Sequence, residues 1–168
     1  SAKVVGPRLL HSTQWGIIDP VDTPDGGNIG LHKNLAIGAH ITTKCSPNIF
    51  IELFNSMGLV YLDELKPSIV STKVFLNGAW IGCTDNPECF RDQLLLKRRN
   101  SLIPIFTSIR WNITMNEIIV FSDGGRLCRP IYYIKKDKMP SFAREFDDFE
   151  KITWKQLTGG IAKHKVIY

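Results

Sequence analysis

Large apolar residues between positions 49 and 57 recur at three- and four-residue spacing, which predicts a helix with one buried face. Ser46 precedes this run as a candidate N-cap, Pro47 suits the first helical position, and Gly58 suits the end of the helix. The apolar stripe consists of Ile49, Phe50, Leu53, Phe54 and Met57. We expect its Phe and Met side chains to belong to a hydrophobic core rather than to a ligand site.

Two β-rich runs, residues 72–76 and 79–83, flank the dipeptide Asn77-Gly78. Asn-Gly between two such runs is the strongest short signal of a β-hairpin with a type I′ turn. A looser alternation over residues 35–43 predicts another strand, although its Ala and Gly content also permits a short helix.

A second helix is predicted directly after this hairpin. Asp85 or Asn86 is its N-cap, Pro87 lies near its first position and Glu88 lies in its first turn. The helix is expected to end at the basic run 97–99. Because acid at the start and base at the end of a helix both suit its dipole, this basic run is explained without a nucleic acid.

A second hairpin is predicted from residues 117–121, a turn at 122–125, and residues 126–134. The arginines and tyrosines of its second strand resemble a basic and aromatic surface. Strand alternation, with Pro130 at a sheet edge, explains them equally well.

Residues 20–31 fit none of these patterns. They hold two prolines, three glycines, two aspartates and an asparagine in twelve residues. Pro fixes φ and lacks an N–H donor, Gly allows positive φ, and Asp and Asn bond their own backbone in turns. We expect a tightly shaped loop held by ordered chain on both sides, and we call it the Gly-rich loop.

The segment before this loop, residues 1–19, has little helical or strand period. One interpretation makes it a surface segment anchored to the core by Trp15, and the other makes it a polar wall beside the Gly-rich loop. The residues concerned are Arg8, His11, Thr13, Gln14 and Trp15.

Composition and charge exclude few classes of fold or function. The chain has 168 residues, of which 43% are hydrophobic and 22% are charged, which suits one globular domain or two small ones. Its net charge of +5 fits a polyanionic partner, but many basic proteins have none. No apolar run approaches the roughly 20 residues that a membrane span needs.

The four cysteines form no C-x-x-C pair, so a zinc site or a disulfide framework is unsupported. We expect buried free thiols in a reducing compartment, with a bond between Cys83 and Cys89 as the alternative. From residue 135 the chain is rich in charge, which predicts a linker or weak helix before another packed unit near Trp154. The chain lacks an initiator Met, and we expect it to be a piece of a longer protein.

Tests for self-contained chemistry give negative results. The glycines match neither a Walker phosphate loop nor the dinucleotide-binding pattern. Counted from Gly26, Leu31 stands where the Walker pattern needs its second Gly, and Gly26 and Gly27 are adjacent where the dinucleotide pattern needs one residue between its first two glycines. Asp22 and Asp25 could act as an acid–base pair or as metal ligands, but acids at this spacing more often cap turns. The four histidines show no metal-binding spacing.

The N-terminal motifs resemble a known family. Residues 8–16, 20–31 and 33–35 follow its pattern of Arg, His-x-Thr-x-Trp/Tyr-Gly, Pro-x-Glu-Thr-Pro-Glu-Gly, Gly-Leu and a Lys-Asn-Leu-like close. This pattern resembles the fork region of the second-largest subunit of multisubunit DNA-directed RNA polymerases, called β in bacteria. Residues 74–130 are similar to the first external domain of that subunit, and residues 154–160 are similar to the opening of the second.

The resemblance implies an α+β fold, in which an irregular fork segment with short helices and strands precedes a small mixed external domain with β-hairpins. The implied divisions are residues 1–68 for the fork region, 69–134 for external domain 1, and 135–168 for a linker and the start of external domain 2. Trp15 and the Phe-Leu-Asn-Gly-x-Trp hairpin resemble the eukaryotic or archaeal form of this subunit, whereas residues 28–30 are closer to the bacterial form. This mixture suggests a divergent lineage such as a large DNA virus.

The resemblance also implies a function, namely template-directed RNA synthesis by a nucleotidyltransferase. The fork lies at the active centre, near the RNA–DNA hybrid and the incoming NTP. Catalytic Mg²⁺ is held mainly by the largest subunit, and this fragment is expected to bind no metal and to carry no catalytic residue. The residues expected to line the active centre and the nucleic acid are Arg8, His11, Thr13, Asp22, Thr23, Asp25 and Asn28.

The expected partners are the largest polymerase subunit, other polymerase subunits, the DNA template, the RNA transcript and NTP, with no membrane. The expected location is intracellular, in the nucleus or in a cytoplasmic viral factory. Asp22 and Asp25 depart from the usual Glu and lose one methylene of reach. Two alternatives are a stand-alone nucleic-acid-binding module and a structural adaptor without an active-centre role.

Overall fold

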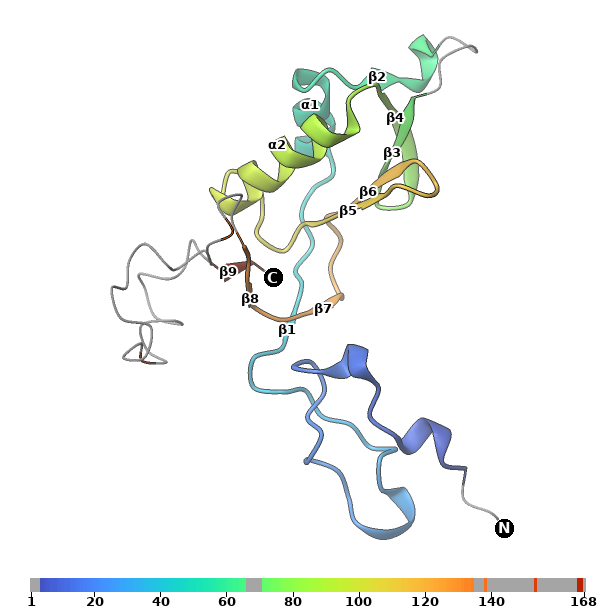
Figure 1. The fold of residues 1–168 in the computed structure, drawn as a ribbon, viewed down its shortest axis with the longest axis vertical. Helices are drawn as coiled ribbons and strands as arrows, with labels where there is room; N and C mark the ends of the chain where they lie inside the picture. Colours follow the sequence, from blue (N-terminus) through green and yellow to red (C-terminus); the bar gives the residue numbers. More distant parts are fainter. Residues whose placement is uncertain (1–3, 66–70, 135–137, 139–152, 154–165, 168) are drawn as a thin grey trace.

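A computed structural model describes residues 4–65, 71–134, 138, 153 and 166–167. Its largest element is a five-stranded sheet with the strand order β2-β4-β3-β6-β5 (Figure 1). The strands are Val60–Tyr61 (β2), Thr72–Leu76 (β3), Ala79–Thr84 (β4), Ser108–Asn112 (β5) and Glu117–Phe121 (β6). β3 and β6 run parallel, and the other neighbouring strands run antiparallel. Strands and helices in one mixed unit confirm the α+β prediction.

The predicted hairpin at Asn77-Gly78 is confirmed. β3 and β4 pair antiparallel on either side of these two residues. Asn77 has φ 51° and Gly78 has φ 85°, the positive values that both central residues of a type I′ turn require. The dipeptide therefore sets the register of the two strands.

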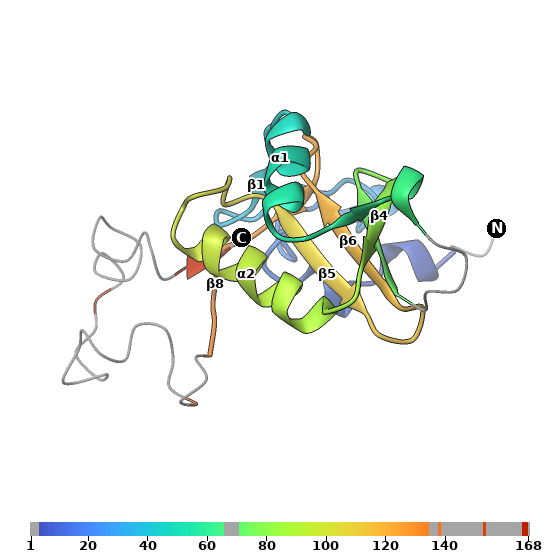
Figure 2. The ribbon, with the colours of Figure 1, turned by 90° about the horizontal axis from the view of Figure 1, so that it is seen from above.

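Two helices, Asn48–Ser56 (α1) and Pro87–Arg99 (α2), cover one face of the sheet (Figure 2). Alternate residues of the central strands, Val74 and Leu76 in β3 and Ile118 and Val120 in β6, point into the same core. The helices contribute Phe50, Phe54, Phe90 and Leu94 to this core. The ring centroids of Phe54 and Phe90 lie 5.3 Å apart, so the two helices contact each other above the strands.

The helix ends match the sequence closely. In α2, the Asn86 side chain accepts a hydrogen bond from the Cys89 N–H at 3.1 Å, which selects Asn86 over Asp85 as the N-cap. The predicted N-cap of α1 was wrong by one residue, because Pro47 takes that position. The Pro47 carbonyl already accepts from the N–H of Ile51 and so opens the helical ladder.

The predicted second hairpin was wrong. β6 has β5 on one edge and β3 on the other, so residues 126–134 find no free edge there. Instead Leu127–Cys128 (β7) pairs with His40–Ile41 (β1), and Ile131–Tyr132 (β8) pairs with Val166–Ile167 (β9). The strand predicted over 35–43 is thereby reduced to β1. The strand that forms a hairpin with β6 is β5. The residues that connect β5 to β6 contain no Gly, so the sequence carries no glycine signal of a turn there.

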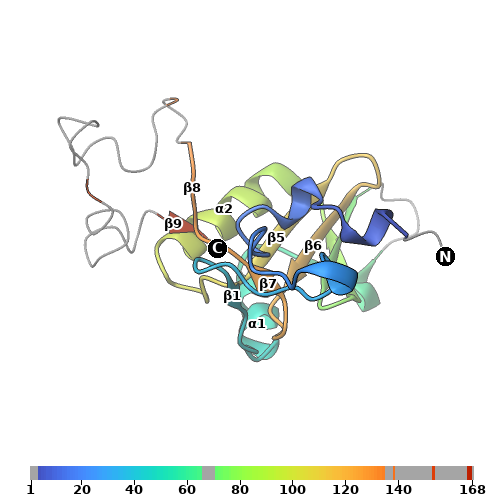
Figure 3. The same ribbon diagram turned by 90° about the horizontal axis from the view of Figure 1, so that it is seen from below.

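Residues 4–41, the N-terminal segment, are built differently. They contain three 3₁₀ helices, Gly6–Arg8 (η1), Ser12–Gln14 (η2) and Gly26–Asn28 (η3), and no buried residue. Figure 3 looks onto this segment from below. Trp15 is 67% exposed, so the interpretation in which Trp15 anchors the segment to the core was wrong. We call the described residues between 42 and 134 the sheet region, which also includes the 3₁₀ helix Leu62–Glu64 (η4).

All four cysteines are free thiols, which excludes the Cys83–Cys89 disulfide in this structure. Cys83 is buried as expected, Cys45 and Cys128 are half-buried, and Cys89 is exposed. Burial raises the pKa of the Cys128 thiol, and the positive charge of Arg126 acts against this rise.

The domain boundaries after residues 68 and 134 stay predictions. The packed unit predicted near Trp154 and most of the linker lie outside the described residues. Within the part of the chain that the structure describes, no helix is long and apolar enough to cross a membrane.

Candidate functional site

The Gly-rich loop is closed at its base by a short antiparallel pairing. Ile18 and Leu35 form a β-bridge, the Asp19 N–H donates to the Asn34 carbonyl, and the Ala36 N–H donates to the Ile17 carbonyl, both at 2.9 Å. The chain therefore enters and leaves the Gly-rich loop at one point. Such closure fixes where the loop begins and ends without any buried core.

Arg8 holds the far side of the loop. Its Nη1 donates to the carbonyls of Gly27 at 2.7 Å and Ile29 at 2.9 Å, and its Nε donates to the Val4 carbonyl at 3.1 Å. Hydrogen bonds from a charged donor are the stronger kind. The sequence pointed to Arg8 as a nucleic-acid contact, whereas its guanidinium here shapes the loop.

Gly30 is required where the loop meets the Arg8 backbone. A Cβ at Gly30 would collide with the Arg8 carbonyl oxygen, and φ at Gly30 is +74°. The Thr23 hydroxyl accepts from the Gly30 N–H at 2.8 Å, which ties the two limbs of the loop together. Thr23 is thus a structural residue of the loop, and it is half-buried.

His11 and Thr13 cap their own turn. The His11 Nδ1 lies 2.8 Å from the Thr13 Oγ1 and accepts from the Thr13 N–H, while the Gln14 side chain accepts from the His11 N–H. Within the described residues, no hydrogen bond joins this pair to the Gly-rich loop. Both residues are exposed, so they form a separate polar surface on η2.

The aspartates and the asparagine of the loop behave differently from one another. The Asp22 carbonyl accepts from the Asn34 side chain at 3.1 Å, and its N–H donates to Asp19 Oδ1 at 3.3 Å, so Asp22 acts through its backbone. Asp25 and Asn28 bracket η3 at the end of the loop, and both are exposed. Among the described residues, neither of these two side chains has a hydrogen-bond or ion-pair partner.

A cavity of about 280 Å³ lies between η1 and the two limbs of the loop. Its walls combine apolar side chains such as Leu9, Ile18 and Ile29 with the basic side chains of Arg8 and Lys33. Lys33 reaches across with its Nζ 3.4 Å from the Pro7 carbonyl. The residues that hold the loop in shape, Arg8, Thr23 and Lys33, therefore also line this cavity.

Metal chemistry has no support in this arrangement. In the part of the chain that the structure describes, no three His, Cys, Asp or Glu side chains gather closely enough to hold an ion. Asp22 and Asp25 are both exposed and are not joined by a shared partner. A Mg²⁺ ion therefore does not fit the residues of this loop by themselves.

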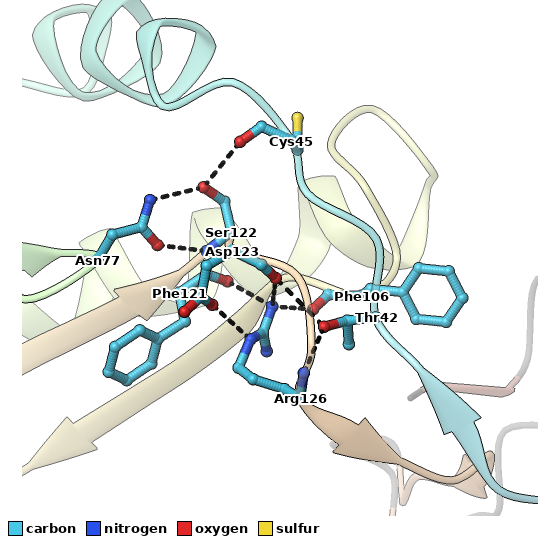
Figure 4. Close-up of polar contacts among 8 residues, drawn as sticks. All are labelled: Thr42, Cys45, Asn77, Phe106, Phe121, Ser122, Asp123 and Arg126. Atoms are coloured by element: carbon cyan, nitrogen blue, oxygen red, sulfur yellow. Dashed lines mark hydrogen bonds and ion pairs between the residues drawn. The ribbon is translucent and has the colours of Figure 1, made fainter.

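Sequence reasoning missed a second polar cluster, at the end of β6. Arg126, Asp123 and Ser122 contact Thr42, Cys45 and Asn77 through hydrogen bonds (Figure 4). We assigned residues 122–125 to a hairpin turn because Asp-Gly-Gly is typical of turns. Only the structure shows that this segment contacts residues far earlier in the chain, as in the hydrogen bond from the Thr42 hydroxyl to the Asp123 carbonyl, which joins residues 81 positions apart.

Comparison with known proteins identifies the arrangement. Residues 1–41 match the family model described as RNA polymerase Rpb2, domain 3, and residues 74–135 match RNA polymerase Rpb2, domain 4. The two matches fall in chain order and together cover more than half of the chain. The chain belongs to the family of second-largest subunits of multisubunit RNA polymerases.

Individual members of the family match over most of this chain. It is 35% identical over 159 residues to DNA-directed RNA polymerase II subunit RPB2 of Encephalitozoon cuniculi, covering 92% of this chain and 14% of that protein. It is 35% identical to the same-named subunit of Schizosaccharomyces pombe, covering 84% and 12%. It is 34% identical to DNA-directed RNA polymerase III subunit 2 of Arabidopsis thaliana, covering 89% and 14%.

The chain thus spans about one seventh of the length of these curated relatives. The match to Rpb2 domain 3 contains the whole Gly-rich loop and the Arg8 that holds it. The match to domain 4 contains β4, α2, β5 and β6 and most of β3. The N-terminal segment and most of the sheet region therefore match two different domain models of the family, and α1, β2 and η4 lie between the two matches.

Proposed function

We propose that this chain is the part of a second-largest polymerase subunit in which the Gly-rich loop lines the active centre, near the RNA–DNA hybrid and the incoming NTP. The whole enzyme is then a DNA-directed RNA polymerase, which transfers nucleotidyl groups onto a growing transcript. The observation that carries the proposal is the geometry of the loop. Contacts from Arg8, Thr23 and Asn34 fix its shape, while Asp25 and Asn28 remain exposed at its end.

These two side chains suit complementary contacts. The Asn28 amide can donate to a phosphate oxygen or accept from a ribose hydroxyl, and the Asp25 carboxylate can accept from a basic side chain of a neighbouring element. Contacts to phosphate and sugar carry no base information, as a polymerase that copies any template requires. Nucleotidyl transfer depends on positioning, so a rigid wall without a catalytic group still affects the rate.

The structure leads us to divide the predicted site into two roles. Arg8 and Thr23, together with the Asp22 backbone, shape the loop, and Asp25 and Asn28 present their side chains outward. His11 and Thr13 form the polar surface on η2, which we include as a flanking contact to nucleic acid. The largest subunit supplies the residues that hold Mg²⁺, which supplies charge neutralisation at the transferred phosphate.

The partners in this proposal are the largest subunit, the remaining polymerase subunits, the DNA template, the RNA transcript and NTP. The enzyme works inside the cell where its template lies. By analogy with RNA polymerases II and III, whose subunits the chain resembles, the location in this proposal is the nucleus. A cytoplasmic viral factory is the location that a viral lineage would imply.

The test uses assembled polymerase that carries Asp25→Ala or Asn28→Ala. Each variant is expected to lower the elongation rate or to raise the misincorporation frequency, because each removes one contact that positions the substrate. The matched controls are Asp63→Ala in η4 and Asn55→Ala in α1, which remove exposed polar side chains from the sheet region. Unchanged elongation and fidelity in both loop variants would mean that the chain is a structural adaptor.

A second measurement separates the proposal from a stand-alone nucleic-acid-binding module. The isolated chain is titrated with single-stranded and double-stranded DNA and with RNA over a range of salt concentrations. We expect no appreciable binding, because the loop presents two exposed acids and one amide rather than a basic patch. Tight binding with a steep salt dependence would count against the active-centre role.

A further inference from the structure

The turn after β6 is hydrogen-bonded to the irregular segment that leads out of the N-terminal segment. Residues 42–45, which we call the connector, follow β1 directly and precede α1. The Thr42 N–H donates to the Arg126 carbonyl and the Gly125 N–H donates to the Thr42 carbonyl, both at 2.9 Å. The Cys45 N–H donates to the Ser122 carbonyl at the same distance. The connector therefore bonds with the turn after β6 at both of its ends.

Side chains reinforce these backbone bonds on the connector side. The Thr42 hydroxyl donates to the Asp123 carbonyl at 3.2 Å and accepts from the Arg126 N–H at 3.0 Å. Thr42 is only 4% exposed, so both bonds are shielded from water. A Cβ on Gly124 would lie 3.0 Å from the Lys44 nitrogen, which explains why the turn carries Gly where the connector passes.

Arg126 holds the turn itself in shape (Figure 4). Its Nε donates to Asp123 Oδ1 at 2.6 Å, and its Nη2 lies within hydrogen-bond distance of three carbonyl oxygens. These oxygens belong to Phe106 at 2.9 Å, Asp123 at 3.0 Å and Phe121 at 3.2 Å. One planar guanidinium thus joins the turn, the end of β6 and the loop before β5, which a flexible ammonium group does not reproduce.

The same cluster reaches the β3–β4 hairpin. The Asn77 Oδ1 accepts from the Ser122 N–H at 2.7 Å, and its Nδ2 donates to the Ser122 hydroxyl at 3.0 Å. The Ser122 hydroxyl in turn lies 3.4 Å from the Cys45 carbonyl. A continuous path of hydrogen bonds therefore runs from the hairpin turn through Ser122 to the connector.

Beyond the turn, the chain continues along the N-terminal segment. β7 pairs with β1, in the register His40 to Cys128 and Ile41 to Leu127. Further on, the Arg129 side chain lies so close to Gly16 that a Cβ there would come within 2.8 Å of the Arg129 Cδ. Residues 122–129 thus contact the connector, β1 and the turn that follows η2.

We propose that residues 122–129 form a joint that fixes the orientation of the N-terminal segment on the sheet region, and that Arg126 is the positioning residue of this joint for the Gly-rich loop. The N-terminal segment has no buried residue of its own, so its orientation depends on contacts at its boundary. The orientation part stands on geometry alone, and the effect on RNA synthesis rests on the function proposed above. Arg126 acts through Thr42 and the connector and contacts no substrate.

The first experiment measures orientation directly in assembled polymerase. Spin labels replace Val21 in the Gly-rich loop and Met115 in the β5–β6 connection, which are both exposed. We expect one narrow distance distribution in the parent and a broader one in Arg126→Gln. The control, Arg110→Gln, removes an exposed arginine of β5 and is expected to leave the distribution unchanged. An unchanged distribution in Arg126→Gln would overturn the joint.

A second variant distinguishes loss of the joint from misfolding of the sheet region. Thr42→Val keeps the shape of the side chain and removes both hydroxyl bonds, while leaving every guanidinium contact of Arg126 intact. It is expected to broaden the same distribution, with hydrogen exchange of the β3 and β6 amides unchanged. Arg126→Lys is expected to behave like Arg126→Gln, because Lys keeps the charge near Asp123 but not the three carbonyl contacts. Full rescue by Lys would overturn the assignment to the guanidinium.

The last experiment links the joint to the loop by a double-mutant cycle on elongation rate. Displacing a positioning element by about 1 Å costs on the order of 100-fold in rate, so Arg126→Gln is expected to slow elongation measurably. Combined with Asn28→Ala, its effect is expected to be less than additive, because both changes remove the same contact. Strict additivity would overturn the action through the loop. A broadened distance distribution in Arg126→Gln, with no effect of either Asp25→Ala or Asn28→Ala on elongation or fidelity, would leave the joint standing and reject the proposed function of the loop.

Discussion

The N-terminal segment and the sheet region achieve a defined shape by different means. In the sheet region, two helices and two central strands exclude water from a shared core that contains Phe50, Phe54, Leu94 and Ile118, all fully buried. In the N-terminal segment, no residue is buried, and shape comes from the Arg8 guanidinium, the Thr23 hydroxyl and backbone bonds at the base of the loop. Burial of apolar side chains contributes most of the stability, whereas hydrogen bonds at the surface define the shape of the backbone and contribute little stability.

This difference suits two tasks. A surface held by polar contacts keeps its backbone and side chains accessible to a substrate, which a buried core does not allow. The N-terminal segment also exposes large apolar side chains, including Val4, Leu10, Trp15, Val21 and Ile37. Exposed apolar groups of this density are typical of surfaces that other parts of an assembly cover.

The largest effect is expected from Phe54→Ala. Phe54 is fully buried and its ring contacts Phe50 and Phe90, so truncation should lower the free energy of unfolding of the sheet region by about 3–5 kcal/mol. The measurement is urea unfolding of the purified chain, followed by far-UV circular dichroism. Leu96→Ala, at a 58% exposed position of α2, is the control and should change stability by less than about 0.5 kcal/mol. Equal losses in the two variants would show that the core is not where the stability lies.

An intermediate effect is expected from Asn77→Gly. Glycine keeps the positive φ of the hairpin turn but leaves the buried Ser122 without its amide partner, which should cost about 1–3 kcal/mol. Ser101→Gly is the control, because Ser101 also has positive φ but is exposed. The same urea titration applies. If the two glycine variants were equally stable, the path from hairpin to connector would contribute nothing.

The smallest effect on global stability is expected from Arg8→Met, at under about 0.5 kcal/mol, since none of the described residues of the hydrophobic core belongs to the N-terminal segment. Locally, however, the loss of a charged donor to two carbonyls should speed amide hydrogen exchange within residues 26–30 by roughly tenfold. Lys33→Met removes the same charge but only a 3.4 Å bond, and it should leave the exchange nearly unchanged. A large global loss in Arg8→Met would erase the contrast between the two regions.

The sequence predicted best where short-range patterns decide the structure. The α1 helix, the Asn77-Gly78 hairpin and the Asn86-Pro87 start of α2 all follow from local rules and are confirmed. Within the predicted apolar stripe of α1, Phe50 and Phe54 are buried, but Ile49 is 51% exposed, so its assignment to the buried face was wrong. The second hairpin failed because strand pairing depends on which edges are free. β6 had already used both of its edges on β3 and β5, a fact that no local window contains.

The site was predictable in part for the same reason. Composition singled out residues 20–31 as a loop, and the family resemblance gave it a role. That Arg8 would bond to Gly27 and Ile29, 19 and 21 residues away, depends on the closed base of the loop rather than on any motif. The Arg126 cluster was missed because the sequence 122–125 is typical of a turn, and a turn explains these residues without any contact to a distant segment.

The parallel pairing of β3 with β6 has a consequence for how the chain folds during synthesis. β3–β4 and β5–β6 are local hairpins, but Val74 meets Ile118 only about 44 residues later in the chain, a closure that costs entropy before it gains any contact. Nascent chains that have released α1, β3, β4 and α2 from the ribosome therefore still expose the apolar faces that β6 will cover. We expect completion of the core to await the emergence of Phe121, which makes this pairing the late and rate-limiting step.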